Sequence, residues 1–139
     1  MDERVLSLLF HADRLLHLNE LSSKENVICD RFELSTLAYQ NDRFYNQEMI
    51  NYFLKIPTLT FYIDIDPKIS LERIKGRTER DLFENLKTLS KVRNNYLNLI
   101  KDLDNVIIVS GEKDIETVYR EIKIYVENLQ ILWFFFKNK

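Results

Sequence analysis

An aspartate and an arginine stand side by side at Asp30-Arg31, directly after the apolar run 27–29. A carboxylate at this place can bind Mg²⁺ directly or through water, and a guanidinium can bind a phosphate through two hydrogen bonds. If residues 26–30 form a strand of a parallel sheet, the pair lies at the strand's carboxyl end, where such sheets bind ligands. A structural ion pair that caps the strand would use the same two residues, so the pair alone leaves both interpretations open.

A second cluster of charge is the stretch 75–80, where Lys75, Arg77 and Arg80 surround Gly76. Cations on a hinge-capable segment are typical of a lid that closes over transferring phosphates and neutralises their developing charge. A solvated loop between two helices would have the same composition. We take about residues 75–84 as the candidate lid.

Phe10 and Arg14 are one helical turn apart on a predicted helix, an arrangement in which a ring can stack on a nucleobase while the guanidinium donates to its edge. For Phe10 taken alone, packing in the core is the simpler interpretation. His11 and His17 have no cysteine partners at zinc-binding spacing, so we expect no structural metal site.

The composition excludes several classes of protein. With 139 residues, 20 Lys and Arg against 22 Asp and Glu, and a net charge of -2, the chain suits one domain (1–139) and not a nucleic-acid binder. The single cysteine, Cys29, allows no internal disulfide, and its apolar neighbours predict that it is buried. The start of the chain does not fit a signal peptide and the apolar run 131–136 is too short for a membrane span, so we expect a cytoplasmic protein.

Glycine is scarce, with only Gly76 and Gly111 in the whole chain. A loop that wraps phosphate in backbone amides needs clustered glycines followed by Lys and Ser or Thr. These 139 residues contain no such motif.

Strand-like and helix-like patterns alternate along the chain, which predicts an α/β fold with a parallel sheet covered by helices on both faces. The predicted strands are 26–30, 59–65 and 105–109; the predicted helices are 3–20, 33–40, 45–54, 67–74, 82–102 and 113–130. Asp66-Pro67 supplies an N-cap and a first helical residue for the fourth of these helices. The helix 3–20 is apolar on more than one face, so we expect one side to meet the sheet and the other a partner subunit.

Two motifs, taken in this order, resemble the thymidylate kinase family of P-loop nucleoside monophosphate kinases. Residues 8–14 (Leu-Leu-Phe-His-Ala-Asp-Arg) with His17 are similar to the family helix Leu-Leu-Phe-x-Ala-Asp-Arg-x-x-His. Residues 27–40 are similar to the family's Asp-Arg-Tyr motif and its Ser-x-Leu-Ala-Tyr-Gln continuation. Residues 71–84 resemble its lid, so the resemblance covers about residues 5–126.

The resemblance implies phosphoryl transfer from ATP, with Mg²⁺, to dTMP, giving dTDP and ADP. Phe10 would stack on thymine, Arg14 would bond the base edge or a nearby phosphate, and Arg31 would grip the monophosphate. Asp30 would lie near Mg²⁺ and, with Arg77 and Arg80, take part in catalysis. The remaining implied residues are Ser35, Tyr39 and Gln40 for the substrate, Arg73, Lys75 and Gly76 for the lid, and the turn 110–112 near adenine. A homodimer through the first helix is also implied.

Several positions depart from the family pattern. Phe32 replaces the usual Tyr, Leu82 stands where the lid has Arg, with Arg80 as a substitute, and Asn41 takes a common Gly position. The family's first two strands and phosphate loop would precede Met1. In the family's strand order, 2-3-1-4-5, their absence would separate the strand 26–30 from the pair 59–65 and 105–109. We therefore expect this chain alone to be inactive as a kinase; the alternative is a non-catalytic remnant that binds nucleotide or dimerises.

Overall fold

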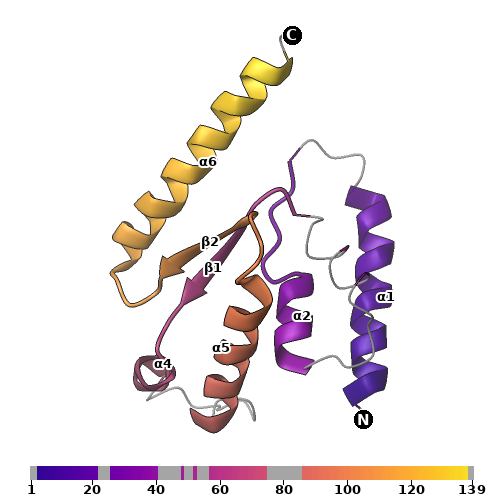
Figure 1. Cartoon of the computed structure of the whole chain (residues 1–139), viewed down its shortest axis with the longest axis vertical. Coiled ribbons are helices and arrows are strands. Elements are labelled where there is room, and N and C mark those ends of the chain that lie inside the picture. The colour runs from indigo at the N-terminus through magenta and orange to yellow at the C-terminus, as the bar shows by residue number, and fades with distance from the viewer. Residues whose placement is uncertain are drawn as a thin grey trace. The chain divides into compact units, whose positions relative to one another are not determined.

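The computed structural model describes residues 3–21, 26–40, 48, 52, 57–74 and 86–137, and their elements are those of an α/β fold (Figure 1). In chain order these are α1 (Glu3–Leu21), α2 (Glu33–Gln40), β1 (Thr60–Asp64), α4 (Pro67–Ile74), α5 (Leu86–Ile100), β2 (Val106–Ser110) and α6 (Ile115–Lys137). The predicted helix 45–54 lies outside the described residues except for Glu48 and Tyr52, which are helical.

The chain divides into two compact units, which we describe separately. The first unit comprises residues 1–58 and 87–104, and the second comprises residues 59–86 and 105–139. The second unit contains the strands and the first contains α1, α2 and most of α5.

In the second unit, β1 and β2 pair in parallel, with a register that runs from Thr60 opposite Val106 to Asp64 opposite Ser110. This confirms the strands predicted at 59–65 and 105–109 and their pairing with each other. Helix α6 packs on β2, and the ring of Tyr125 lies 6.1 Å from that of Phe61 on β1. Val109 is the most buried apolar side chain of this small sheet, with 2% of its surface exposed.

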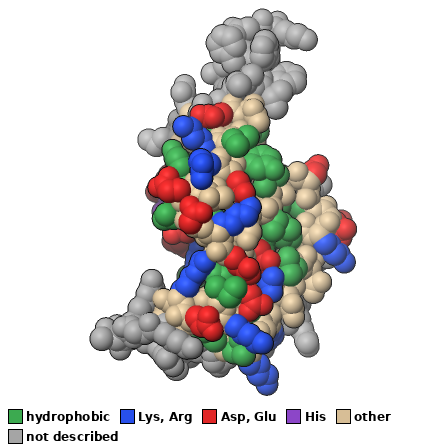
Figure 2. All heavy atoms as spheres, turned by 90° about the vertical axis from the view of Figure 1, so that its left-hand side faces the viewer, with side chains coloured by type: hydrophobic (Ala, Val, Ile, Leu, Met, Phe, Trp, Pro, Cys, Tyr) green, Lys and Arg blue, Asp and Glu red, His purple; other side chains and the backbone are tan. Residues whose placement is uncertain are grey.

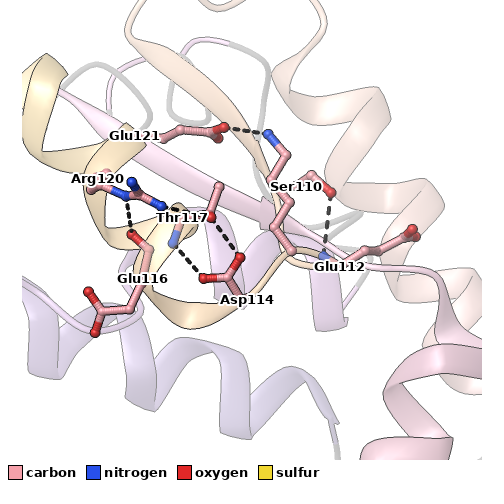
Figure 3. A network of polar contacts seen from close by, with 8 residues as sticks. Ser110, Glu112, Asp114, Glu116, Thr117, Arg120 and Glu121 are labelled. Atoms are coloured by element: carbon pink, nitrogen blue, oxygen red, sulfur yellow. Dashed lines mark hydrogen bonds and ion pairs between the residues drawn. The ribbon is translucent and has the colours of Figure 1, made fainter.

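A side-chain carboxylate caps the N-terminus of α4 and another caps that of α6. The Oδ1 of Asp66 accepts from the backbone N of Lys68 at 2.8 Å, ahead of Pro67, as the sequence predicts for the start of α4. At α6, Asp114 accepts from the backbone N of Thr117 at 3.0 Å and from its hydroxyl at 2.6 Å (Figure 3). Helix α6 continues to Lys137, beyond the predicted end at 130, so the backbone of the run 131–136 is helical.

In the first unit, α2 lies between α1 and α5 and is the most buried of the three helices (Figure 1). Its apolar residues Leu34, Leu37 and Ala38 are buried, as are Val92 and Ile100 of α5. The side-chain amide of Asn95 on α5 donates to the backbone carbonyl of Ala38 at 2.8 Å. Amphipathic helices that are too short to be stable alone acquire their stability from such packing.

The prediction of a buried strand at 26–30 is wrong. Residues 26–30 have no strand geometry, Ile28 is 99% exposed, and Cys29 is exposed rather than buried. A strand forms only when a neighbouring strand satisfies its backbone N–H and C=O groups. The described part of this unit contains no other strand to supply them.

The apolar surface of α1 is largely open to solvent in the isolated chain. Leu8, Leu9 and Leu16 are 58%, 55% and 69% exposed. Elsewhere, on the face that Figure 2 shows, cations, carboxylates and hydrophobic side chains are interspersed. Among the described helices, none is both long and apolar enough to cross a bilayer.

Candidate functional site

Arg31 occupies a left-handed backbone conformation, with a φ of 59°. Side chains other than glycine seldom adopt this region, and such residues gather at functional sites because the surrounding structure must stabilise them. The guanidinium carbon of Arg31 lies 5.6 Å from the centre of the Tyr39 ring on α2. The turn therefore holds Arg31 against α2, while the carboxylate of Asp30 beside it is exposed to solvent.

Arg14 reaches from α1 to the start of α2. Its Nη1 donates to the hydroxyl of Thr36 at 2.7 Å, and its guanidinium carbon lies 5.6 Å from the centre of the Phe32 ring. Phe32 directly follows Arg31, so the structure brings two guanidinium groups, from α1 and from the turn before α2, onto adjacent parts of one segment. These contacts bring Arg14 to the segment that follows the Asp30-Arg31 pair; a shared ligand site for the three residues stays a prediction.

Phe10 lies on α1 one turn before Arg14, with 43% of its surface exposed. Burial in the core therefore does not account for this ring. Stacking of this ring on a base stays a prediction.

Tyr96 of α5 contacts the candidate site, and its place in the apolar stripe of its helix did not by itself indicate this in the sequence. Its ring meets the ring of Tyr39 edge to face, with centroids 6.4 Å apart. Burial raises the pKa of Tyr96, more than a hydrogen bond with the Ser35 side chain lowers it. A tyrosine within an aliphatic stripe was the available signal, since a buried phenol needs a polar partner.

In the second unit, Arg73 at the end of α4 binds the turn after β2. Its two terminal nitrogens donate to the carbonyl of Gly111 at 2.6 Å and to that of Glu112 at 3.0 Å. These bonds hold the guanidinium against the backbone of the turn; the lid role of Arg73 stays a prediction.

The family profile described as thymidylate kinase matches residues 1–122 of this chain. The chain belongs to the thymidylate kinase family. Among curated relatives, a probable thymidylate kinase of Methanocaldococcus jannaschii is 34% identical over 136 residues, covering 93% of this chain and 70% of that protein. A probable thymidylate kinase of Sulfolobus acidocaldarius is 39% identical over 122 residues, covering 84% of this chain and 63% of that protein. A thymidylate kinase of Leptospira interrogans is 36% identical over 120 residues, covering 81% of this chain and 58% of that protein.

The chain thus spans between 58% and 70% of the length of these three relatives. The thymidylate kinase motifs all fall within the matched range. Of the residues that these motifs imply, Phe10, Arg14, Arg31, Ser35 and Tyr39 belong to the first unit. The lid residues Lys75, Gly76, Arg77 and Arg80 lie outside the described residues, as does the side chain of Gln40.

Asp30 is the one residue that the thymidylate kinase motifs suggest for Mg²⁺. Among the described residues, no group of three or more His, Cys, Asp or Glu side chains could hold a metal ion on its own. Mg²⁺ in kinases commonly keeps several waters and binds one or two carboxylates together with substrate phosphates. Asp30 has such an exposed carboxylate, next to Arg31 in the chain.

Proposed function

We propose that this chain supplies the dTMP-binding portion of a thymidylate kinase, which transfers a phosphoryl group from ATP to dTMP to give dTDP and ADP. The observation that supports it most is the pair of guanidinium groups held over aromatic rings of one segment, Arg14 over Phe32 and Arg31 over Tyr39. Two anchored cations, one of them a helical turn from the exposed ring of Phe10, suit a ligand that combines an aromatic base with a phosphate.

Each group has a distinct role in this proposal. Phe10 stacks on thymine and Arg14 donates to its edge; Arg31 binds the monophosphate, and Ser35, Tyr39 and Gln40 line the deoxyribose and base. Asp30 meets Mg²⁺ directly or through water near the transferring phosphoryl group. Arg77 and Arg80 close over the phosphates with the rest of the lid, and the turn 110–112 lies by adenine.

The test is calorimetric titration of the 139-residue chain with dTMP and with thymidine, which lacks the phosphate. We expect dTMP to bind more tightly than thymidine, and Arg31→Ala to weaken dTMP about tenfold or more while leaving thymidine nearly unchanged. Arg120→Ala on α6, whose side chain bonds within its own helix, is the matched control. Equal affinity of the folded Arg31→Ala chain and the original chain for dTMP would overturn the assignment.

Turnover is a separate matter, because no phosphate-wrapping loop occurs within these 139 residues. In a coupled ADP-release assay with ATP, Mg²⁺ and dTMP, we expect the chain alone to remain far below the roughly 1–100 per second of typical kinases. Turnover within that range would contradict this expectation while leaving the dTMP site intact.

We further propose that the protein is cytoplasmic and forms a homodimer through α1. The support is the open apolar surface of that helix, where Leu8, Leu9 and Leu16 are each more than half exposed. Sedimentation velocity should show a dimer that Leu16→Glu dissociates. Ile124→Glu, on the similarly exposed Ile124 of α6, is the control that should leave the dimer intact.

A further inference from the structure

A buried carboxylate and a buried imidazole meet where α1 crosses the start of α2. Glu33 is the first residue of α2 and is 1% exposed, while His11 on α1 is 4% exposed. The Nδ1 of His11 contacts the Oε1 of Glu33. Removing ionisable groups from water is costly unless partners compensate them, so this pair calls for an explanation beyond packing.

The second oxygen of Glu33 faces Arg14. The Oε2 of Glu33 lies 3.7 Å from the Nε of Arg14, whose outer Nη1 donates to Thr36. The inner edge of the guanidinium therefore faces the carboxylate and one outer nitrogen faces the hydroxyl of a buried threonine. An ion pair with Glu33 and a hydrogen bond to Thr36, both on α2, restrict a side chain that otherwise has many rotamers.

His11 completes the arrangement from the same helix as Arg14. His11 and Arg14 are three residues apart on α1, so both side chains face α2 from one side of the helix. The carboxylate of Glu33 is thus shared between an imidazole and a guanidinium from a single helix surface. A carboxylate at the first position of a helix is also favoured by the unsatisfied N–H groups there.

We propose that Glu33, itself held by His11, is a positioning residue that orients the Arg14 guanidinium for recognition of the thymine base. This inference rests on the proposed dTMP-binding function. The chemistry to be recognised is a pyrimidine that presents an acceptor at position 4: thymine has O4 there, whereas cytosine presents an amino donor. A guanidinium has hydrogen-bond donors and no acceptor. When its orientation is fixed, it can bind the O4 of thymine but cannot pair with the amino group of cytosine.

A purely structural ion pair would behave differently. Buried ion pairs are weak evidence for stability, and removing one partner commonly destabilises a protein without touching ligand choice. The decisive readouts are therefore the order of the Arg14 side chain and the preference for dTMP over dCMP.

The first experiment uses NMR of the arginine Nε–Hε groups in the ligand-free chain. We expect the Arg14 signal to report an ordered side chain, and Glu33→Gln to raise its mobility markedly. Arg73, which is held by backbone carbonyls of the second unit, should stay unchanged and serves as the internal control. An Arg14 signal of the same order in folded Glu33→Gln overturns the positioning role, whether or not the chain binds dTMP.

The second experiment is a double-mutant cycle on dTMP and dCMP binding with Glu33→Gln and Arg14→Ala. We expect Glu33→Gln alone to weaken dTMP about tenfold and to reduce its advantage over dCMP by a similar factor. In the Arg14→Ala background, Glu33→Gln should have little further effect. Val92→Ala, which removes buried volume from α5, controls for lost stability and should leave the dTMP/dCMP ratio unchanged.

The outcomes separate the two proposals. If the original chain does not bind dTMP, the proposed function fails, and recognition of thymine by Arg14 fails with it. If dTMP binds and Glu33→Gln acts equally with and without Arg14, the function stands and the positioning role of Glu33 is overturned. His11→Gln should reproduce part of the effect of Glu33→Gln, because it weakens the support of the same carboxylate.

Discussion

The rings of Tyr39 on α2 and Tyr96 on α5 meet edge to face, with their planes at 89° and their centroids 6.4 Å apart. Tyr39 in turn lies under the guanidinium of Arg31. A partly buried residue of α5 is thereby linked through one aromatic ring to the cation proposed to bind phosphate. The ring of Tyr39 therefore contacts both a neighbouring helix and the guanidinium of Arg31.

We predict that ionisation of Tyr96 lowers the free energy of unfolding at alkaline pH. Burial raises its pKa above the ordinary 10.0, so the folded state favours the neutral phenol. This contribution is fully present below pH 10 and is lost as pH rises through the raised pKa. Urea unfolding from pH 8 to 11 should show the decline, and Tyr96→Phe should remove this component. A decline of the same size in Tyr96→Phe would assign it to other groups.

At neutral pH, Tyr96→Phe should lower the free energy of unfolding by about 0.5–1.5 kcal/mol, because the hydrogen bond with the Ser35 side chain is lost. Urea unfolding at pH 7 measures this loss. Ser35→Ala breaks the same bond from α2, so the double variant should cost less than the sum of the single variants. Additive losses would mean that the two side chains act independently.

Arg31 allows backbone strain and ligand binding to be separated. Arg31→Gly and Arg31→Ala both remove the guanidinium, and both should lose the preference for dTMP over thymidine. Only glycine adopts a φ of 59° without strain, so Arg31→Gly should be more stable than Arg31→Ala by about 1 kcal/mol. Thermal and urea unfolding of the two variants check this difference. Equal stability would show that the turn relaxes when the side chain is removed.

Gly111 should tolerate no side chain. A Cβ at this position would lie 2.8 Å from the Cγ2 of Ile63 and 3.2 Å from the carbonyl oxygen of Asp64. That carbonyl also accepts from the Gly111 backbone N at 2.7 Å, so the turn cannot move away without loss of the bond. Gly111→Ala should destabilise the chain by about 1–3 kcal/mol. Gly111→Ala combined with Ile63→Ala should recover part of the loss, which unfolding by urea can measure.

Asp114 should make the start of α6 sensitive to acid. Hydrogen bonds from Thr117 hold the pKa of the Asp114 carboxyl below its ordinary value. The stabilisation is therefore present above the ordinary pKa and is lost as pH falls through the lowered one. An NMR titration of the Asp114 carboxyl should report the depressed pKa, and Thr117→Val should move it back toward normal. An unchanged pKa in Thr117→Val would mean that the hydroxyl does not stabilise the carboxylate.

Local patterns in the sequence were sufficient for most of the secondary structure. The helix at 3–20, the Asp66-Pro67 helix start and the two strands β1 and β2 all lie where the sequence predicts them. The family was also recognisable, because its motifs are short, ordered and rich in residues with specific chemistry. These features depend on neighbours within a few positions, and the sequence displays such neighbours directly.

Tertiary structure alone decided the features that depend on distant partners. Whether residues 26–30 become a strand is a matter of which other strand is beside them, not of their own apolar character. Arg14 donates to the hydroxyl of Thr36, 22 positions away, and Arg73 donates to the carbonyl of Gly111, 38 positions away. The His11–Glu33 contact could not be predicted either, because no local sequence pattern indicates that the two residues meet across two helices. Burial and long-range contact set the energies of these charged groups, and only the folded chain specifies both.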